Sequence, residues 1–299
     1  YLSAAVEVLL RDIERLQAAR ANIDHCPMGA AAITTSGFPI DRARMADLLG
    51  FSEPLRNSYG CIASVDYVTG LYSAIKLTFL HLGRLIQDMQ FWSAFEVGQL
   101  HVPGSLVQIS SIMPQKRNPV PIEHLRHLAS MTCGRADAVI NTMHNTPFTD
   151  MNDSEGEVQV AGYAAFHSGA RVLDLLAALI SAVSINGERV AENIDAACIT
   201  VTELADTLVR RENLSFRQAH EIAAATARAV IAAGKPLGEG FEAFSKAFRE
   251  LTRRDSTLDP AAYGEAVSAR HFVAVRERFG GPGPEAMNEA LQTYRATLT

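Results

Sequence analysis

The stretch from Ser58 to Leu100 constrains the fold more than any other part of the sequence. It contains almost no helix breaker except isolated glycines, and apolar residues recur on several faces of the expected helix. A helix that is apolar nearly all round is buried among other helices. The positions that carry this pattern are Leu71, Ile75, Leu77, Phe79, Leu80, Leu82, Leu85 and Ile86. The sequence therefore predicts a long helix inside a helical bundle.

Three further segments carry a helical pattern: residues 1–23, 118–142 and 152–183. Asp41 is expected to cap a short helix that ends near Gly50. No stretch alternates apolar and polar residues with a period of two for long enough to indicate a sheet. Long helices without sheets usually form bundles, often between subunits, so the predicted fold class is all-α.

The chain has two consecutive parts that differ in helix length and in glycine and proline content. Residues 1–190 hold the long helices and are expected to form a central bundle domain. Residues 191–299 hold shorter helices with more glycine and proline, which predicts a small helical domain. Because Tyr1 lies in the middle of a helical pattern, we expect the first domain to lack an N-terminal part.

Composition excludes several classes of protein. The 299 residues are 48% hydrophobic and 20% charged, which permits a large core, and a net charge of −6 opposes nucleic-acid binding. The longest apolar runs are broken by charge, so no membrane partner is expected. Four scattered cysteines without a CxxC pair suit a reducing compartment and a cytoplasmic location. His124 and His127 lie one helical turn apart, but no third ligand stands at a useful spacing, so we expect no metal.

The loop "QISSIMPQKRNPVPIE", residues 108–123, gathers unusual chemistry before a helix. Asn118 is a suitable N-cap, and Pro119 is suited to the first helical position. A helix N-terminus attracts carboxylates, and Lys116 adds a full positive charge beside it. Together these groups predict a clamp for a substrate carboxylate.

Ser110 and Ser111 lie on the same loop. A serine hydroxyl is a weak base unless N–H donors or cations stabilise its oxyanion. Such a serine could remove a proton next to a carboxylate held by Lys116, and the leaving group would depart from the neighbouring carbon. The same residues also suit an ordinary solvated connection, and the loop alone does not decide between the two readings.

The sequence of this loop resembles a known motif. "SSIMPQKRNP" is similar to the "GSSxMPxKxNP" segment of the aspartase/fumarase superfamily, and "IMPQK" resembles argininosuccinate lyases in particular. Three other segments resemble the same family in the same order. They are "CPMGAAAITTSGFPIDR" (26–42), "TELADTLVRRENLSFRQAHE" (202–221) and "RERFGGPGPEAM" (276–287).

The resemblance implies a fold, a reaction and a set of residues. The family forms homotetramers whose central helices share one bundle, with each active site built from several subunits. Its reaction is the reversible elimination of fumarate from a succinyl compound, without a cofactor. The resemblance makes Ser110 the catalytic base and pairs Glu123 with an active-site histidine expected before Tyr1. It assigns the substrate to Ser111, Met113, Lys116, Asn118, Asp150 and Asn152.

The chain departs from the family at three places that bear on activity. Ile109 stands where the family has glycine, which should change how the loop closes. The segment "PFTDMNDSEGE" (147–157) stands where argininosuccinate lyases have "YNKDLQEDKE". Asp150 is kept, but the family's tyrosine, glutamine, aspartate and lysine become Pro147, Asn152, Ser154 and Glu155. "NSYGCIASVD" (57–66) similarly replaces the charged "NSMDATSDRD".

These departures leave three hypotheses. The first is a carbon–nitrogen lyase that releases fumarate from an N-substituted aspartate and whose amine-side pocket differs from that of argininosuccinate lyase. The second is a lyase for another adduct such as adenylosuccinate, because "DMNDSEGE" somewhat resembles a segment of that enzyme. The third is a catalytically silent, crystallin-like structural protein, which Ile109 and the altered segment would support.

Overall fold

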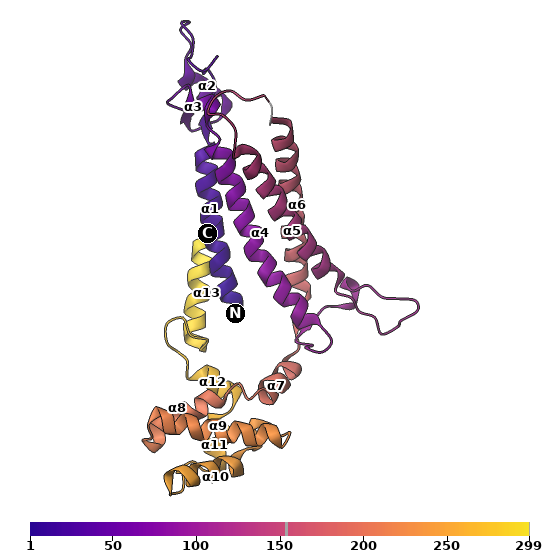
Figure 1. Cartoon of the computed structure of the whole chain (residues 1–299), viewed down its shortest axis with the longest axis vertical. Helices are drawn as coiled ribbons and strands as arrows, with labels where there is room; N and C mark the ends of the chain where they lie inside the picture. Colours follow the sequence, from indigo (N-terminus) through magenta and orange to yellow (C-terminus); the bar gives the residue numbers. More distant parts are fainter. Residues whose placement is uncertain (153–154, 299) are drawn as a thin grey trace. The chain divides into compact units, whose positions relative to one another are not determined.

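The computed structural model describes residues 1–152 and 155–298, and these form two compact units (Figure 1). Unit 1 comprises residues 1–96 and 100–184, and unit 2 comprises residues 97–99 and 185–299. Helices dominate both units, and the strands are only two residues long. The predicted all-α class is therefore confirmed.

Four long helices build unit 1. They are α1 (Leu2–Ile23), α4 (Asp66–Ser93), α5 (Val120–Met143) and α6 (Glu155–Ala182). Helix α4 packs against α1 on one side and α5 on the other, and α6 packs against α5 (Figure 1). The long helix expected from residue 58 begins at Asp66, because the short helix α3 (Gly60–Ala63) precedes it.

The core of unit 1 lies between α4, α5 and α6. Its fully buried side chains include Leu82, Ile86, Ile122, Leu125, Val172 and Leu179. Leu77 and Leu80 of α4 remain 38% and 45% exposed. Burial of α4 on all sides, which its sequence predicts, is thus incomplete within one chain.

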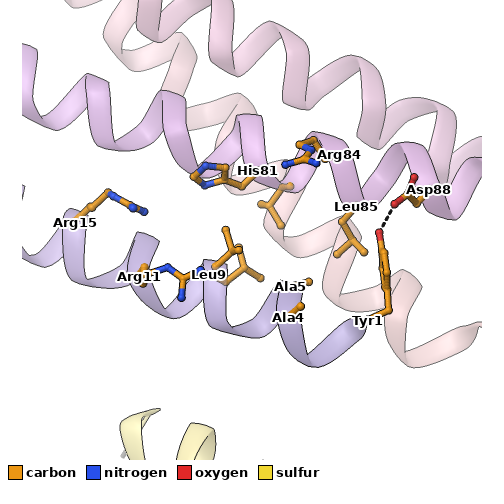
Figure 2. A pocket seen from close by; sticks show the side chains of 12 residues that line it. Tyr1, Ala4, Ala5, Leu9, Arg11, Arg15, His81, Arg84, Leu85 and Asp88 are labelled. Carbon is orange, nitrogen blue, oxygen red and sulfur yellow. Dashed lines mark hydrogen bonds between the residues drawn. The ribbon is translucent and has the colours of Figure 1, made fainter. Parts of the chain in front are cut away.

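A buried carboxylate ties α1 to α4. The carboxylate of Asp12 is fully buried and lies 2.6 Å from Arg15 Nη1 and 2.8 Å from His81 Nδ1. These two partners line a groove of about 390 Å³ between the helices, together with Arg11 and Arg84 (Figure 2). A buried charge left without its partner is strongly destabilising, so Asp12 fixes how α1 packs on α4.

Smaller elements complete unit 1. Strand β1 (His25–Cys26) pairs in parallel with β2 (Glu53–Pro54), and α2 (Arg42–Leu49) lies between them in the sequence. The predicted cap of α2 is confirmed, because Asp41 accepts a hydrogen bond from Arg44 N and Gly50 ends the helix with φ 79°. The remaining elements are β3 (Leu100–His101), the 3₁₀ helix η1 (Gly104–Leu106) and β4 (Ser184–Ile185), whose last residue belongs to unit 2.

Helix α6 is long and apolar enough to cross a membrane by length and composition alone, and 33% of its most apolar window is buried. A core helix of a bundle passes the same test. Here the buried face of α6 packs on α5.

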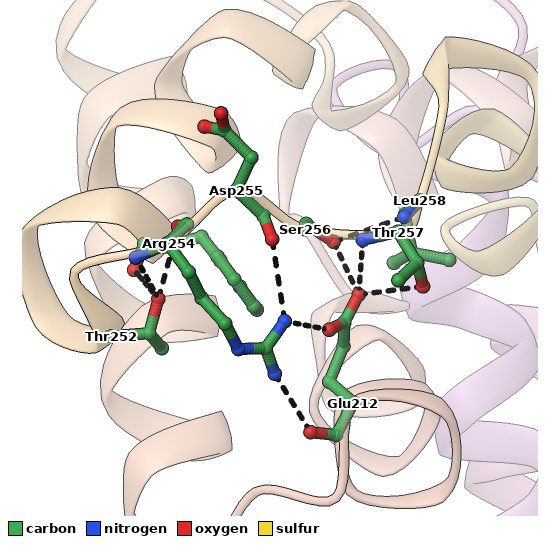
Figure 3. A network of polar contacts seen from close by, with 8 residues as sticks. Glu212, Thr252, Arg254, Asp255, Ser256, Thr257 and Leu258 are labelled. Atoms are coloured by element: carbon green, nitrogen blue, oxygen red, sulfur yellow. Dashed lines mark hydrogen bonds and ion pairs between the residues drawn. The ribbon is translucent and has the colours of Figure 1, made fainter.

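Unit 2 contains shorter helices. They are α7 (Gly187–Ala196), α8 (Val201–Glu212), α9 (Phe216–Ala232), η2 (Leu237–Glu239), α10 (Phe241–Thr252), α11 (Pro260–Ala266), α12 (Ala269–Ala274) and α13 (Pro284–Leu298). Phe244, Phe248 and Tyr263 are buried at the centre of its own core. Glu212, at the end of α8, binds the loop after α10 through a network of polar contacts (Figure 3).

Candidate active site

The loop before α5 is closed at its base by two backbone hydrogen bonds. Gln108 N donates to Asn118 O at 3.0 Å, and Asn118 N donates to Gln108 O at 3.3 Å. The guanidinium of Arg117 adds a third tie, because its Nη2 donates to Val102 O at 2.8 Å. Residues 109–117 are therefore held as one closed loop at the N-terminal end of α5.

The predicted role of Asn118 as N-cap is wrong. Helix α5 begins at Val120, its N-cap is Pro119, and no side chain caps it. The Gln108–Asn118 bridge uses the backbone of Asn118, which displaces the helix start by two residues from the expected position. The side-chain amide of Asn118 is thereby left for a role other than capping.

Ser110 lies inside this loop with its hydroxyl oxygen turned to the backbone. Its Oγ accepts hydrogen bonds from Ile112 N at 3.2 Å and Met113 N at 3.1 Å. Two N–H donors aimed at one oxygen stabilise negative charge on it, as in an oxyanion hole. Both donors belong to the next three residues of the chain, so the local backbone itself points two N–H groups at the Ser110 oxygen.

The other predicted residues of the loop lie close to Ser110 in the sequence. Lys116 N donates to Met113 O at 3.0 Å, which forms a turn and keeps the lysine in the loop. Ser111 and Met113 are exposed, whereas Lys116 and Asn118 are half-buried. Five of the predicted site residues therefore share one closed loop.

Glu123 and Ile109 flank this group. Glu123 lies in the first turn of α5 and is half-buried, and its carboxylate has no hydrogen-bond or ion-pair partner among the residues described. Ile109 is 75% exposed, and its φ is not positive. The backbone freedom of glycine is therefore not required at this position in the conformation seen here.

Asp150 and Asn152 lie elsewhere, on the segment between α5 and α6. Both are exposed. Thr149 N donates to Pro147 O at 2.9 Å, which makes a tight turn just before Asp150. Ser154, one of the departures from the family pattern, lies outside the described residues.

The two groups of predicted residues occupy opposite ends of α5. Ser110 to Glu123 lie at its start, whereas Asp150 and Asn152 follow its end (Figure 1). The 24 residues of α5 span about 36 Å at 1.5 Å per residue. One copy of the chain therefore does not bring the two groups together.

Two contacting residues escaped the sequence reasoning. Arg117 follows Lys116 in the loop, and its guanidinium donates a hydrogen bond to the backbone of Val102. Tyr59, just before α3, donates to Phe148 O and so touches the segment that carries Asp150. A tyrosine in a turn gives no signal of this contact in the sequence, because its partner is distant along the chain.

Comparison with known proteins shows which proteins this chain is similar to. A family model described as "Lyase" matches residues 1–134, and one described as "Argininosuccinate lyase C-terminal" matches residues 198–274. Argininosuccinate lyase 2 of Agrobacterium fabrum is 66% identical over 299 residues, which cover 100% of this chain and 59% of that protein. Along its whole length the chain is similar to argininosuccinate lyases.

Other proteins similar to this chain agree. Argininosuccinate lyase of Methanoculleus marisnigri is 33% identical and covers 100% of this chain and 60% of its own length. A structure of an EDDS lyase variant with bound fumarate is 28% identical, with a TM-score of 0.85, and covers 100% of this chain and 59% of its own. The chain thus spans about 60% of the length of these relatives.

The residues that the structure describes offer no arrangement suited to a metal ion. No group of three or more histidine, cysteine or acidic residues is arranged to hold a metal ion within residues 1–152 and 155–298. The expectation that the reaction needs no metal or other cofactor stays a prediction.

Proposed function

We propose that the protein is a carbon–nitrogen lyase that eliminates fumarate from an N-substituted aspartate. One observation carries the proposal: the Ser110 oxygen accepts two backbone N–H groups within a closed loop that also holds Lys116. This arrangement supports a serine that can carry negative charge beside a cation. The relatives named argininosuccinate lyase support the same class of reaction.

The proposed mechanism uses these groups in sequence. The Ser110 alkoxide removes a proton from the carbon next to the one that bears the amine. The electron pair of that C–H bond moves into the adjacent carboxylate, which Lys116, Asn118 and Ser111 hold. The pair then returns to form the C=C bond of fumarate while the C–N bond breaks. The leaving amine takes a proton from a group that these loop residues do not supply, and the reverse sequence adds the amine to fumarate.

We also propose that the active enzyme is a homotetramer with sites shared between copies. The loop at the start of α5 and the segment after its end lie about 36 Å apart in one chain, so a site that uses both must draw them from different copies. Helix α6 supports an interface, because Tyr163 is 74% exposed and several other apolar residues share its uncovered surface. They are Val160, Phe166, Leu173 and Ile180. A contiguous exposed apolar surface commonly marks a protein interface.

The natural substrate is proposed to be an aspartate adduct other than argininosuccinate. The support is the segment 147–157, which differs in charge from the argininosuccinate lyase pattern. Glu155 in place of a lysine beside a substrate carboxylate would weaken binding where both groups lose water. The EDDS lyase neighbours, which are named for another substrate, support the view that related chains take different amine parts. A cytoplasmic, cofactor-free enzyme without nucleic-acid or membrane partners fits the composition.

A catalytically silent structural protein is the weaker alternative. Ile109 and the altered segment 147–157 would support it, but Ser110 accepts its two backbone hydrogen bonds with isoleucine at position 109. The retained group of Ser110, Lys116, Asn118 and Glu123 favours an enzyme.

Replacement of Ser110 tests the proposal. In the natural full-length protein, we expect Ser110→Ala to lower kcat about 100-fold or more, since a proton-transfer group contributes about that factor. Ser105→Ala, in the exposed turn η1, is the matched control and should leave the rate unchanged. The assay follows the ultraviolet absorbance of fumarate with a panel of aspartate adducts. A Ser110→Ala variant that keeps more than about a tenth of the activity would contradict the mechanism.

A further inference from the structure

Tyr59 reaches from the turn before α3 to the segment after α5. Its hydroxyl donates to Phe148 O at 3.0 Å, and the two aromatic rings lie 6.0 Å apart between centroids. The turn that carries Tyr59 is itself fixed, because Asn57 Oδ1 accepts a hydrogen bond from Gly60 N at 3.0 Å. A phenol on a fixed turn is a rigid donor, since its side chain has only two rotatable torsions before the ring.

The other hydrogen bonds of the segment after α5 join residues that are close together in the sequence. Thr146 Oγ1 donates to Met143 O, and Thr149 N donates to Pro147 O. The first bond reaches only the last residue of α5, which directly precedes the segment, and the second lies within the segment. Among the residues that the structure describes, the Tyr59 hydroxyl makes the hydrogen bond that ties residues 147–150 to a different part of unit 1. Phe148 is 69% exposed, so packing adds little restraint.

We propose that Tyr59 is a positioning residue for substrate specificity. It holds the backbone of Phe148 and thereby places Asp150, two residues later, for contact with the amine part of the substrate. The inference rests on the proposed function. A segment ordered before the substrate arrives loses less conformational entropy on binding, which strengthens binding without adding a contact.

This contact does not follow from the family pattern. The family segments quoted above have methionine at the position of Tyr59 and tyrosine at the position of Pro147. Here the phenol of Tyr59, in the turn before α3, contacts the same segment instead. The amine-side segment of this chain is therefore held differently, in keeping with a substrate whose amine part differs.

Removal of one hydroxyl tests the role of Tyr59. In the natural full-length protein, Tyr59→Phe should raise KM about five-fold for the aspartate adduct that the wild type cleaves fastest, with kcat within about two-fold, the factor expected for one net hydrogen bond. Tyr59→Leu, which also removes the ring contact, should raise KM further. Tyr67→Phe is the matched control, because Tyr67 is also exposed and nearby in the sequence but has no hydrogen bond to the segment.

Two measurements distinguish a positioning role of Tyr59 from a general loss of structure in the variant. Inhibition by fumarate should be unchanged in Tyr59→Phe, because fumarate has no amine part. Amide hydrogen exchange of residues 147–152 should become faster in Tyr59→Phe and stay unchanged in Tyr67→Phe.

Equal KM values in the two phenylalanine variants, or a parallel loss of fumarate inhibition, would overturn the inference. If the wild type cleaves no adduct in the panel, the proposed function fails instead. Hydrogen exchange then still tests Tyr59: unchanged exchange in Tyr59→Phe would overturn its role at the segment, and faster exchange would support it.

Discussion

At the scale of single residues, buried carboxylates are tied to arginines in both units. Asp12 binds Arg15 in unit 1, whereas Glu203 binds Arg276 and Glu212 binds Arg254 in unit 2. Glu212 is only 5% exposed, and its Oε1 accepts hydrogen bonds from Ser256 and from both the backbone and the side chain of Thr257 (Figure 3). Removal of one partner from such a pair strongly destabilises the folded state, because the remaining charge stays buried without compensation.

The network sets the acid sensitivity of Glu212. Burial alone would raise its pKa, but the hydrogen bonds from Ser256, Arg254 and Thr257 outweigh burial and lower the pKa to about 2. A carboxylate with a depressed pKa in the folded state contributes stability above its unfolded pKa. That contribution is lost as the pH falls through the folded value.

Replacement of Glu212 by glutamine should therefore destabilise the protein in a pH-dependent way. We expect Glu212→Gln to lower the free energy of unfolding by about 3 kcal/mol at pH 7, with roughly half of that difference left at pH 3. Urea denaturation of the wild type and the variant at both pH values measures this difference in the free energy of unfolding. Asp255→Asn is the control, because Asp255 pairs with Arg249 on an exposed surface, where ion pairs contribute about 0–1 kcal/mol. A difference that does not shrink at pH 3 would contradict the electrostatic explanation.

At the scale of elements, the three central helices of unit 1 meet at a glycine. Gly169 of α6 faces Phe79 of α4 and Thr132 of α5. A Cβ atom at residue 169 would lie 2.8 Å from Phe79 Cζ, and Phe79 is buried with little room to move. The absence of a side chain at this point lets α6 approach the bundle closely, and the buried hydrogen bond from Thr132 to Ser168 lies beside it.

Two glycine-to-alanine substitutions should therefore have opposite signs. Gly169→Ala should destabilise the chain by about 1–3 kcal/mol through overpacking. Gly134→Ala, in α5 with no atom within 4 Å of the added Cβ, should stabilise it by roughly 0.5–1 kcal/mol through helix propensity. Thermal or urea unfolding measures both. Two variants of equal stability would show that α6 does not pack as closely as the structure indicates.

At the scale of the whole molecule, the separation of the predicted site residues matters most. Both ends of α5 carry candidate residues, and no bending within one long helix brings its ends together. A shared site predicts that two inactive variants can restore each other when they assemble together.

Mixing Ser110→Ala with Asp150→Ala tests this prediction. Each variant alone should be nearly inactive, whereas mixed tetramers should recover part of the wild-type rate, since some sites then combine an intact Ser110 with an intact Asp150 from different copies. The mixture is denatured, refolded and assayed for fumarate, with each single variant treated in the same way as a control. Mixed tetramers that form but stay inactive would mean that each site draws both residues from one copy.

The local chemistry could be predicted from the sequence because it depends on residues close together in the chain. The cap of α2 by Asp41, the long helices and the presence of Ser110 and Lys116 in one loop are of this kind. The error at Asn118 arose because the Gln108–Asn118 bridge competes with the cap, and a bridge across ten residues leaves no local pattern. The domain boundary at residue 190 stays a prediction, as do the roles of Glu123 and Asp150.

The sequence by itself determined an all-helical chain with a serine and a lysine in one loop, since periodicity, capping and motif are all local properties. Only the tertiary structure decided that this loop and the Asp150 segment lie at opposite ends of α5, and that Tyr59 holds that segment. The physical reason is that helix length and packing fix distances between residues that the chain order does not reveal.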